Sequence, residues 1–351
     1  MKIVVDDKIP FIRDAIAQIS DQVVYRPGKD ICPEDVQDAD ALIVRTRTHC
    51  DAALLQGSKV SFIATATIGY DHLDTEYLKQ AHIAWANCPG CNASSVGQYL
   101  HSCLLLLEKE KGYDLTQTTI GLVGVGHVGH AVIEAIRPLG VHILLNDPPQ
   151  AETLQQAGQA ADMFLSLEEL QSRCDIISFH TPLILNGKHP TYHLADKHFF
   201  GKLARKPVII NTSRGSVIDN QALLQALKEG KIRDAIIDTW ENEPDINQEL
   251  LHLIYIGTPH IAGYSADGKA NATRMALTAL CRHFHLPANF QIHAPKLPRN
   301  AIAFPFAPEK ELALELYNPH TDSMKLKNHP ELFEDLRGNY PLRREIPEII
   351  T

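Results

Sequence analysis

Short apolar runs alternate with helical stretches along most of the chain. In the first third, residues 3–5, 41–44 and 62–64 form runs rich in β-branched residues, each followed by polar residues or glycine. Such runs are typical of buried strands in a parallel sheet. Residues 92–111 predict a long helix, because their apolar side chains recur at intervals of three and four residues.

From Thr118 onward the alternation becomes regular. The apolar runs are 120–125, 141–145, 175–179, 207–210, 235–237 and 253–256. Two of the segments between them, 130–139 and 220–230, have the apolar spacing and the closing glycine of helices. Strands that alternate with helices predict an α/β fold with a doubly wound parallel sheet.

After Leu286 the pattern changes. Nine of the 21 prolines lie in the last 66 residues, and the β-α alternation stops. This region is expected to form a small irregular module, or an arm that packs on another subunit.

Composition narrows the possible functions. With 351 residues, 44% of them hydrophobic and 21% charged, the chain is typical of a globular protein of two or three domains. A formal net charge of −9 gives no reason to expect nucleic-acid or anionic-membrane binding. Because no apolar run reaches 18 residues, we expect no membrane span.

The cysteines indicate a reduced protein. There are seven, they are scattered, and no secretory signal precedes them, so a cytoplasmic location without disulfides is expected. Cys88 and Cys91 fit the C-x-x-C pattern. With no second pair and no histidine at metal-ligand spacing, neither redox chemistry nor a bound metal is predicted.

A dinucleotide-binding motif follows the first strand of the regular region. The segment 124–129 is Gly-Val-Gly-His-Val-Gly, with a predicted strand before it and a predicted helix after it. In this motif Gly124 permits the tight turn, Gly126 lets the backbone approach the pyrophosphate, and Gly129 brings the helix close to the sheet. The pyrophosphate would lie at the helix N-terminus, where free N–H groups favour an anion. The alternative is a glycine-rich turn without a ligand.

Asp147 predicts which dinucleotide binds. It ends the next predicted strand, 23 residues after Gly124, where a carboxylate can accept hydrogen bonds from the adenosine ribose. Pro148 and Pro149 follow it, so no arginine is present to neutralise a 2′-phosphate. The predicted cofactor is therefore NAD rather than NADP.

Three later strands end near residues that form a coherent catalytic set. The apolar runs that close near 210, 237 and 256 lead to Arg214, Glu243 and His260. The carboxyl ends of parallel strands line the ligand crevice of an open sheet. Taken singly, each residue has an ordinary explanation as part of a turn or loop.

Together the three side chains suit the oxidation of a 2-hydroxy acid. Histidine, with an ordinary pKa of about 6.5, can take the hydroxyl proton. A carboxylate such as Glu243 would hold the imidazole in one tautomer. Arg214 can bind the substrate carboxylate through two parallel hydrogen bonds and polarise the developing carbonyl.

The motifs that carry these residues resemble a known family, the D-isomer-specific 2-hydroxyacid dehydrogenases. The segments are 124–129 (GVGHVG), 211–215 (NTSRG), 238–244 (DTWENEP) and 258–263 (TPHIAG). The resemblance covers about residues 1–285. It implies two Rossmann-like domains: a flavodoxin-like substrate domain of residues 1–93 and 263–285, and an NAD domain of residues 94–262.

Further segments are similar to one branch of this family, which oxidises a 4-phosphorylated four-carbon hydroxy acid in vitamin B6 biosynthesis. They are 1–6, 44–46, 64–72, 89–93, 147–149 and 260–264, with 333–340 and 343–345 in the tail. The similarity implies that residues 286–351 form an α+β dimerisation module. Because the chain ends at Thr351, we expect a shortened module. The implied partners are the phosphorylated hydroxy acid and a second copy of the chain.

The resemblance also implies residue roles. Arg214, Glu243 and His260 are expected to be catalytic, with His260 as the acid/base. The expected NAD contacts are Gly124, Gly126, His127, Val128, Gly129, Asp147, Thr181, Asp238 and Gly263. The expected substrate contacts are Thr46, Thr67 and Tyr264, with Arg45 added as a candidate for the phosphate.

The residues themselves do not identify the phosphate site. Arg45 and Arg47 are candidate cations, as are Arg343 and Arg344 reaching from a partner subunit. All four side chains have the alternative of being solvated surface charges. Two other functions remain open: a different D-2-hydroxyacid dehydrogenase, such as one acting on phosphoglycerate, and a non-catalytic NAD-sensing protein.

Overall fold

The computed structural model of the chain describes residues 1–295 and 309–345. These residues form two compact units: residues 1–92 with 265–295, and residues 93–264 with 309–345. The described C-terminal residues from 309 belong to the second of these units. That they form a dimerisation module stays a prediction.

The first unit is built on a five-stranded, fully parallel sheet. Its strand order is β2-β1-β3-β4-β5, the order of flavodoxin-like sheets. The elements are β1 (Lys2–Asp6), α1 (Arg13–Ile16), β2 (Gln22–Arg26), α2 (Pro33–Val36), β3 (Ala41–Val44), α3 (Ala52–Leu55), β4 (Phe62–Thr65), α4 (Thr75–Gln80), β5 (Ala84–Ala86) and α12 (Ala266–His283).

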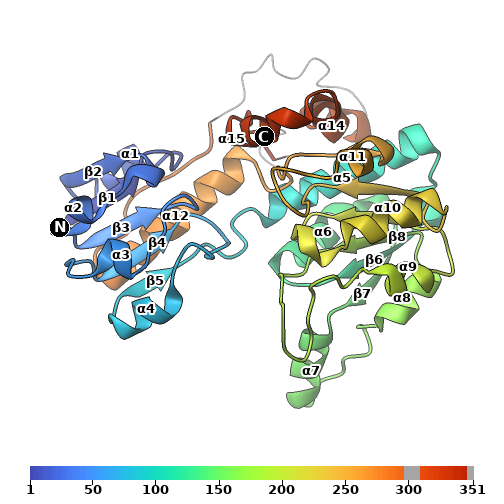
Figure 1. Cartoon of the computed structure of the whole chain (residues 1–351), viewed down its shortest axis with the longest axis horizontal. Coiled ribbons are helices and arrows are strands. Elements are labelled where there is room, and N and C mark those ends of the chain that lie inside the picture. Colours follow the sequence, from blue (N-terminus) through green and yellow to red (C-terminus); the bar gives the residue numbers. More distant parts are fainter. Residues whose placement is uncertain (296–308, 346–351) are drawn as a thin grey trace. The chain divides into compact units, whose positions relative to one another are not determined.

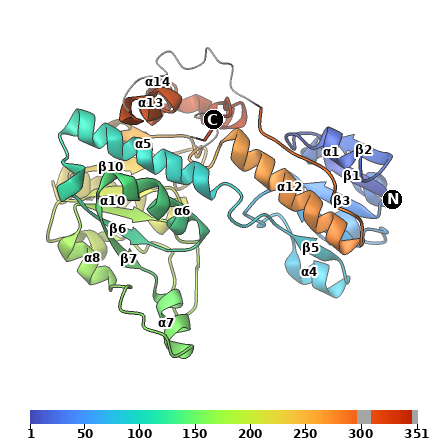
Figure 2. The ribbon, with the colours of Figure 1, turned by 180° about the vertical axis from the view of Figure 1, so that it is seen from behind.

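Helices cover both faces of this sheet. The apolar faces of α1 and α12 pack on one side, where Ile16 and Leu277 are fully buried. Helices α2, α3 and α4 cover the other side. The long helix α12 runs along the sheet of this unit (Figure 2).

The second unit contains a six-stranded parallel sheet with the order β11-β10-β9-β8-β6-β7. The elements are α5 (Ala93–Lys111), β6 (Thr119–Val123), α6 (His127–Ile136), β7 (His142–Asn146), α7 (Pro148–Gln156), α8 (Leu167–Arg173), β8 (Ile176–Phe179), α9 (Lys197–Gly201), β9 (Val208–Asn211), α10 (Asn220–Lys228), β10 (Asp234–Ile237), α11 (Gln248–Leu253), β11 (Ile256–Gly257), α13 (Glu309–Leu316), α14 (Pro319–Asn328) and α15 (Phe333–Gly338). The strand order reverses between β6 and β8, which is where doubly wound sheets bind their ligands.

Two apolar layers hold this sheet. Helices α5, α6 and α13 pack on one face, and α8, α9, α10 and α11 pack on the other. Figure 1 shows the sheet of this unit with helices in front of it and behind it. The predicted doubly wound architecture is confirmed for both units.

The described C-terminal residues close one edge of the six-stranded sheet. The backbone N–H of Gly257, in the edge strand β11, donates to Ser323 Oγ on α14 at 2.9 Å. Lys327 Nζ donates to the carbonyls of Ile254 and Tyr255. Helix α14 therefore satisfies backbone groups that an open sheet edge leaves unpaired.

Three local predictions are wrong or incomplete. Strands β2 and β5 were missed because they lie at sheet edges, where half-exposed side chains weaken the apolar pattern. The run 253–256 is mostly not a strand: Leu253 ends α11, and β11 is only Ile256–Gly257. Helix α6 begins at His127 rather than His130, because Gly126 is already its N-cap.

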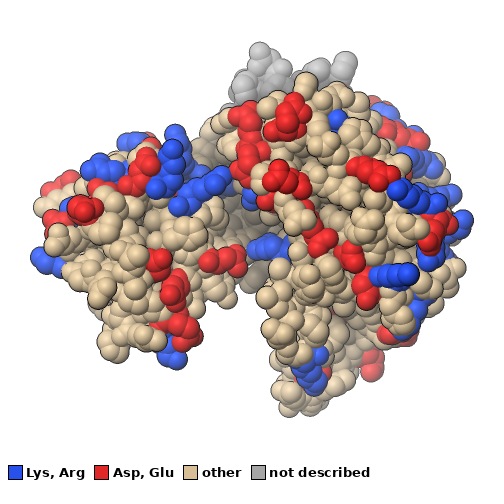
Figure 3. Space-filling view, viewed as in Figure 1, with Lys and Arg blue, Asp and Glu red and all other residues tan. Residues whose placement is uncertain are grey.

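The surface is mixed in charge. On the face shown in Figure 3, acidic and basic residues are interspersed over both units. No helix in residues 1–295 or 309–345 combines the length and apolar character needed to cross a bilayer.

Candidate active site

The glycine turn lies at the point where the strand order of the second unit reverses. Gly124 follows β6 with a φ of 91°, and a Cβ there would lie 2.9 Å from the carbonyl carbon and oxygen of His180, just after β8. The backbones after β6 and β8 are therefore in close contact. Only glycine combines this left-handed conformation with so close an approach.

Two observations show that the turn suits a dinucleotide. A Cβ on Gly126 would meet no atom within 4 Å, so the backbone there is open for a phosphate to approach. The Thr181 hydroxyl oxygen is buried and has no hydrogen-bond partner among the residues that the structure describes. A buried polar atom of this kind requires an explanation, and a ligand at the switch point supplies one.

Asp147 is fixed at the end of β7 by bonds to both of its oxygens. Oδ1 accepts from the backbone N–H of Gln150 at 3.0 Å and so caps α7, while Oδ2 accepts from the N–H of Val125 at 2.8 Å. The Gln150 amide donates to Asp147 Oδ2 at 3.0 Å and to the Val125 carbonyl at 2.6 Å. Gln150 thus ties the carboxylate to the glycine turn, a role that no sequence signal indicated.

We expect Asp147→Asn to raise the KM for NAD about 10-fold and to narrow the preference for NAD over NADP. The amide keeps an acceptor for the α7 cap but loses the charge that strengthens bonds to ribose hydroxyls and repels a 2′-phosphate. Initial rates with each cofactor measure this. Asp114→Asn, which changes another turn-capping carboxylate in the same unit, is the control. Unchanged kinetics with both cofactors would refute the assignment of Asp147.

Glu243 and His260 form a hydrogen-bonded pair. His260 Nδ1 lies 2.8 Å from Glu243 Oε2 and 3.1 Å from Oε1, and Oε1 also accepts from the backbone N–H of Trp240 at 2.9 Å. The side chains are 27% and 16% exposed, so the pair is sheltered but reachable. Because Nδ1 is engaged by the carboxylate, Nε2 is the ring nitrogen available to a substrate.

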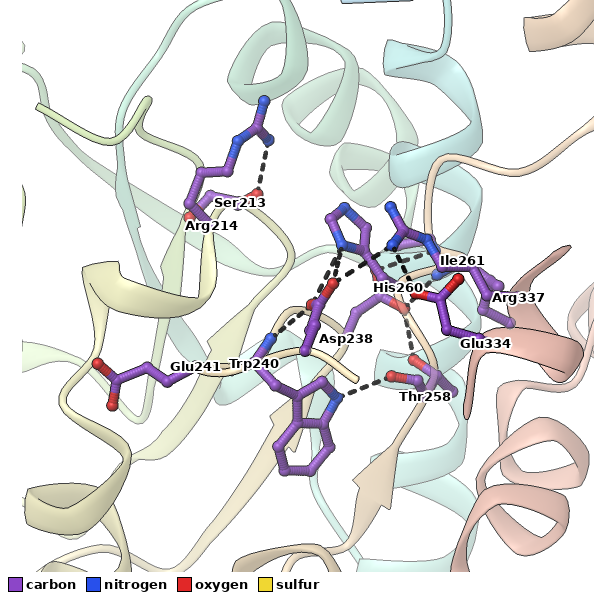
Figure 4. A network of polar contacts seen from close by, with 12 residues as sticks. Ser213, Arg214, Asp238, Trp240, Glu241, Thr258, His260, Ile261, Glu334 and Arg337 are labelled. Carbon is purple, nitrogen blue, oxygen red and sulfur yellow. Dashed lines mark hydrogen bonds and ion pairs between the residues drawn. The ribbon is translucent and has the colours of Figure 1, made fainter. Parts of the chain in front are cut away.

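Asp238 organises the loop that carries His260. Its Oδ1 accepts from the Thr258 hydroxyl at 2.6 Å and from the Ile261 N–H at 2.8 Å, and its Oδ2 accepts from the Ala262 N–H at 3.0 Å. Figure 4 shows this network around the His260 imidazole. His260 itself has a φ of 57°, a strained conformation that persists only where the surroundings hold it. The NAD contact expected of Asp238 stays a prediction, since these bonds lie within the chain.

Charges in the pair follow from burial and contacts. Burial opposes the ionisation of Glu243, but the hydrogen bond and charge of His260 outweigh it, with help from Trp240 and Arg337, and lower the pKa of this carboxyl. Burial raises the pKa of Asp238 despite the nearby His260 and its hydrogen bonds. Burial also lowers the pKa of His180 to about 3, so this histidine is neutral at physiological pH.

Arg214 follows β9, so the three candidate catalytic residues come from the ends of adjacent strands β9, β10 and β11. Its backbone carbonyl accepts from Asn211 Nδ2 at 2.9 Å, and its Nη1 donates to the Ser213 carbonyl at 2.9 Å. The next residue, Gly215, packs so tightly that a Cβ there would lie 1.8 Å from the Trp240 carbonyl oxygen. Close backbone packing therefore couples the Arg214 loop to the loop that leads to Glu243.

In the first unit, Thr67 is the end of a chain of hydrogen bonds. Its hydroxyl donates to the Gly69 carbonyl at 2.8 Å and lies 2.6 Å from the Thr65 hydroxyl. The Thr65 hydroxyl in turn lies 2.9 Å from His72 Nε2. A hydroxyl has one proton, so Thr65 must donate to Thr67 and His72 must donate to Thr65. Thr67 is left with an acceptor position. Burial lowers the pKa of His72, in agreement with a neutral donor ring.

The other predicted substrate residues are accessible. Arg45 is half-buried and donates from Nη1 to the Lys8 carbonyl at 3.1 Å, while Thr46 and Arg47 are exposed. The proposal that Arg343 and Arg344 supply phosphate contacts from a partner, or lie as solvated charges, disagrees with their burial. Their exposed fractions are 8% and 6% within their own chain.

The Cys88–Cys91 pair has the chemistry of buried structural thiols. Cys88 Sγ lies 3.3 and 3.2 Å from the carbonyl oxygens of Thr65 and Ala272, which share its one S–H proton. Burial raises the pKa of Cys88 to about 12 and that of Cys91 to about 11. Thiols this weakly acidic are poor nucleophiles and poor metal ligands. Within residues 1–295 and 309–345, no group of three or more His, Cys, Asp or Glu side chains is arranged to hold a metal ion.

Comparison with known proteins yields one family. The model described as "D-isomer specific 2-hydroxyacid dehydrogenase, NAD binding domain" matches residues 104–262. This range includes the glycine turn together with Arg214, Glu243 and His260.

Curated relatives extend the similarity over nearly the whole chain. The erythronate-4-phosphate dehydrogenase of Bacteroides fragilis is 57% identical over 345 residues, which are 98% of this chain and 97% of the relative. The enzyme of the same name from Porphyromonas gingivalis is 41% identical over 353 residues, 99% of this chain and 94% of the relative.

A solved structure agrees with the fold. It is the NAD⁺-bound 3-phosphoglycerate dehydrogenase of Entamoeba histolytica, with 28% identity and a TM-score of 0.65, and the match covers 84% of this chain and 98% of that chain.

Proposed function

The chain belongs to the D-isomer-specific 2-hydroxyacid dehydrogenases, and on this premise we propose that it oxidises 4-phospho-D-erythronate to 2-oxo-3-hydroxy-4-phosphobutanoate in vitamin B6 biosynthesis, with NAD as cofactor. The observation that carries the reaction type is the Glu243–His260 pair at the strand ends of a dinucleotide-binding sheet. The 57% identity to a relative named for this substrate supports the substrate class.

His260 acts as the general base. Its Nδ1–H donates to Glu243, which leaves the lone pair on Nε2 to take the proton of the substrate's 2-hydroxyl. As the imidazole becomes a cation, the Glu243 carboxylate stabilises it and keeps the ring oriented. The glycine turn and Asp147 would hold NAD, which would supply the acceptor for the hydride that leaves C2.

Arg214 holds and polarises the substrate. Its guanidinium is partly exposed, bonded to one carbonyl, and retains N–H groups to pair with the substrate carboxylate and the oxygen at C2. The positive charge stabilises the carbonyl that forms as the hydroxyl proton moves to His260.

Further substrate contacts are proposed at Thr46, Thr67, Arg45 and Tyr264. The acceptor position of Thr67 suits a hydroxyl of the substrate, because a carboxylate or phosphate oxygen has no proton to donate. Arg45 is a cation with donors suited to the phosphate. Gly263, His127 and Val128 complete the proposed NAD contacts. We also propose that the enzyme is cytoplasmic and homodimeric, and light scattering in solution measures the latter.

Initial rates of NADH formation from a panel of acids test the substrate. We expect the highest kcat/KM with 4-phosphoerythronate, a lower value with its 3-deoxy analogue, and much lower values with 3-phosphoglycerate and lactate. Turnover of 3-phosphoglycerate or lactate but not of 4-phosphoerythronate would overturn the substrate assignment. NAD binding without turnover of any of these acids would favour an NAD-sensing protein.

A further inference from the structure

Arg343 is a buried arginine whose five N–H groups all donate to its own chain. It is 8% exposed, and its guanidinium lies 4.0 Å from the centre of the Tyr317 ring. The acceptors are Gln98 Oε1 (from Nε, 2.9 Å) and the backbone carbonyls of Ile261 (Nη1, 3.0 Å), Tyr264 (Nη1, 2.8 Å), Ser95 (Nη2, 3.1 Å) and Ala262 (Nη2, 2.5 Å). No donor of this guanidinium is left for a ligand.

Three of these carbonyls belong to residues 261–264, directly after His260. The N–H groups of Ile261 and Ala262 are bonded to the Asp238 carboxylate. The loop is therefore held from both sides, with its amides on a buried carboxylate and its carbonyls on a buried guanidinium. Because His260 has a positive φ, its position depends on such external restraints.

The arginine cannot be replaced by another cation without loss of bonds. A lysine offers three donors on a flexible stem, whereas arginine offers five in a fixed plane. The surrounding chain also anchors this arginine. Gln98 Nε2 donates to the Arg344 carbonyl at 2.8 Å, and Ser95 Oγ donates to Glu345 Oε1 at 2.8 Å. These two hydrogen bonds join the first turns of α5 to residues 343–345.

A second arginine of this region reaches the carboxylate of the pair. Arg337 Nη1, on α15, lies 3.6 Å from Glu243 Oε2 and 3.9 Å from Glu334 Oε1, and Figure 4 shows it entering beside His260. The charged groups facing the pair are Asp238, which interacts with His260, and Arg337, which interacts with Glu243. Behind them, Glu334 and Tyr264 interact with Arg337. A cation at this place opposes a second positive charge on the imidazole.

We propose that residues 333–345, here called the C-terminal segment, are a positioning element for the Glu243–His260 pair. Arg343 fixes the loop that carries His260, and Arg337 sets the charge behind Glu243. The inference rests on the proposed function only in taking this pair as the proton-transfer pair. It makes no use of the identity of the substrate.

Arg343→Lys and Arg343→Met test the contact of Arg343 with the loop that carries His260. We expect kcat to fall about 10-fold or more for lysine and further for methionine, since a misplacement of about 1 Å can cost about 100-fold. NADH affinity should fall much less than kcat, because the proposed NAD contacts at the glycine turn and Asp147 come from other strand ends than the loop that Arg343 holds. Lys310→Met is the control: it removes an exposed ion pair between α13 and α5 and leaves the loop untouched.

Wild-type kcat in both variants would overturn the role of Arg343. If neither variant folds, Gln98→Leu removes the acceptor of Arg343 Nε and the donor to Arg344 instead. We expect that variant to bind NADH normally and to lose kcat. Full kcat in a folded Gln98→Leu enzyme would contradict the proposal in the same way.

Arg337→Met tests the contact of Arg337 with Glu243 through the pH dependence of kcat/KM. Loss of the cation should let the pair hold its proton more strongly, so the acid limb of kcat/KM should move to higher pH by about half a unit or more. Arg337→Lys should restore the wild-type profile, and Lys310→Met should leave it unchanged. If the acid limb of the kcat/KM profile does not move in Arg337→Met, the proposed role of Arg337 is refuted.

An NMR titration of the His260 ring, assigned by comparison with His260→Gln, gives the same readout without turnover. A shift of the titration midpoint to higher pH in Arg337→Met supports the proposal, and coincident curves contradict it. The kinetic assays use whichever 2-hydroxy acid the wild type oxidises. A wrong substrate assignment is therefore distinguished from a wrong role for the C-terminal segment.

Discussion

His260→Ala should lower kcat by about 10²–10⁴-fold while NAD affinity stays within about 2-fold. The imidazole is the group placed to take the hydroxyl proton, and the NAD contacts proposed at the glycine turn and Asp147 come from other strand ends. Single-turnover absorbance at saturating NAD measures the chemical step, and fluorescence titration measures cofactor binding.

The pair predicts a further result for this variant. Because Glu243 acts through His260, adding Glu243→Gln to His260→Ala should cost little more, whereas Glu243→Gln alone should be clearly impaired. His252→Ala, which removes an exposed histidine from α11, serves as the control. Near-normal turnover in His260→Ala, or independent additive losses in the double variant, would count against the proposed base.

Arg214→Lys should lower kcat/KM by about 10²–10³-fold, the cost expected when a preorganised charge-stabilising donor set is lost. Lysine keeps the charge but cannot form two parallel bonds to a carboxylate. Among residues 1–295 and 309–345, the Arg214 side chain bonds only to the adjacent Ser213 carbonyl, so the fold should not change. Thermal unfolding checks this, and steady-state kinetics with the preferred acid measures the loss.

Arg205→Lys is the matched control for this substitution. Arg205 is an exposed arginine of the same unit, paired with Asp175 at 2.6 Å and remote from the strand ends that carry the site. It should retain full activity. Activity of Arg214→Lys within about 2-fold of wild type would show that bidentate binding at this position is not needed.

Much of the fold was predictable because the relevant physics is local. The apolar stripe of residues 92–111 predicted α5, which the structure places at Ala93–Lys111, and the strand-turn-helix pattern around Gly124 predicted the nucleotide-binding turn. The placement of Arg214, Glu243 and His260 after adjacent strands was predictable because parallel strands present their carboxyl ends at one edge. The edge strands β2 and β5 were missed because solvent on one side weakens their pattern.

The features that sequence reasoning missed depend on long-range contacts. Arg343 lies 79 residues from Tyr264 and 245 from Gln98, and its burial has no local signature in a proline-rich tail. The same holds for His72, whose ring orders Thr67 through Thr65, and for Arg337 beside Glu243. A charged residue in a sequence is most often exposed, so only the folded chain distinguishes these from surface charges.

The contact at Gly215 has a consequence for engineering. Because no side chain fits between residue 215 and the Trp240 carbonyl, the segments 212–217 and 239–244 form one interlocked unit. A chimaera that imports either segment alone from a related enzyme brings a mismatched backbone into this contact. Altered specificity is therefore best sought by transplanting both segments as a single cassette.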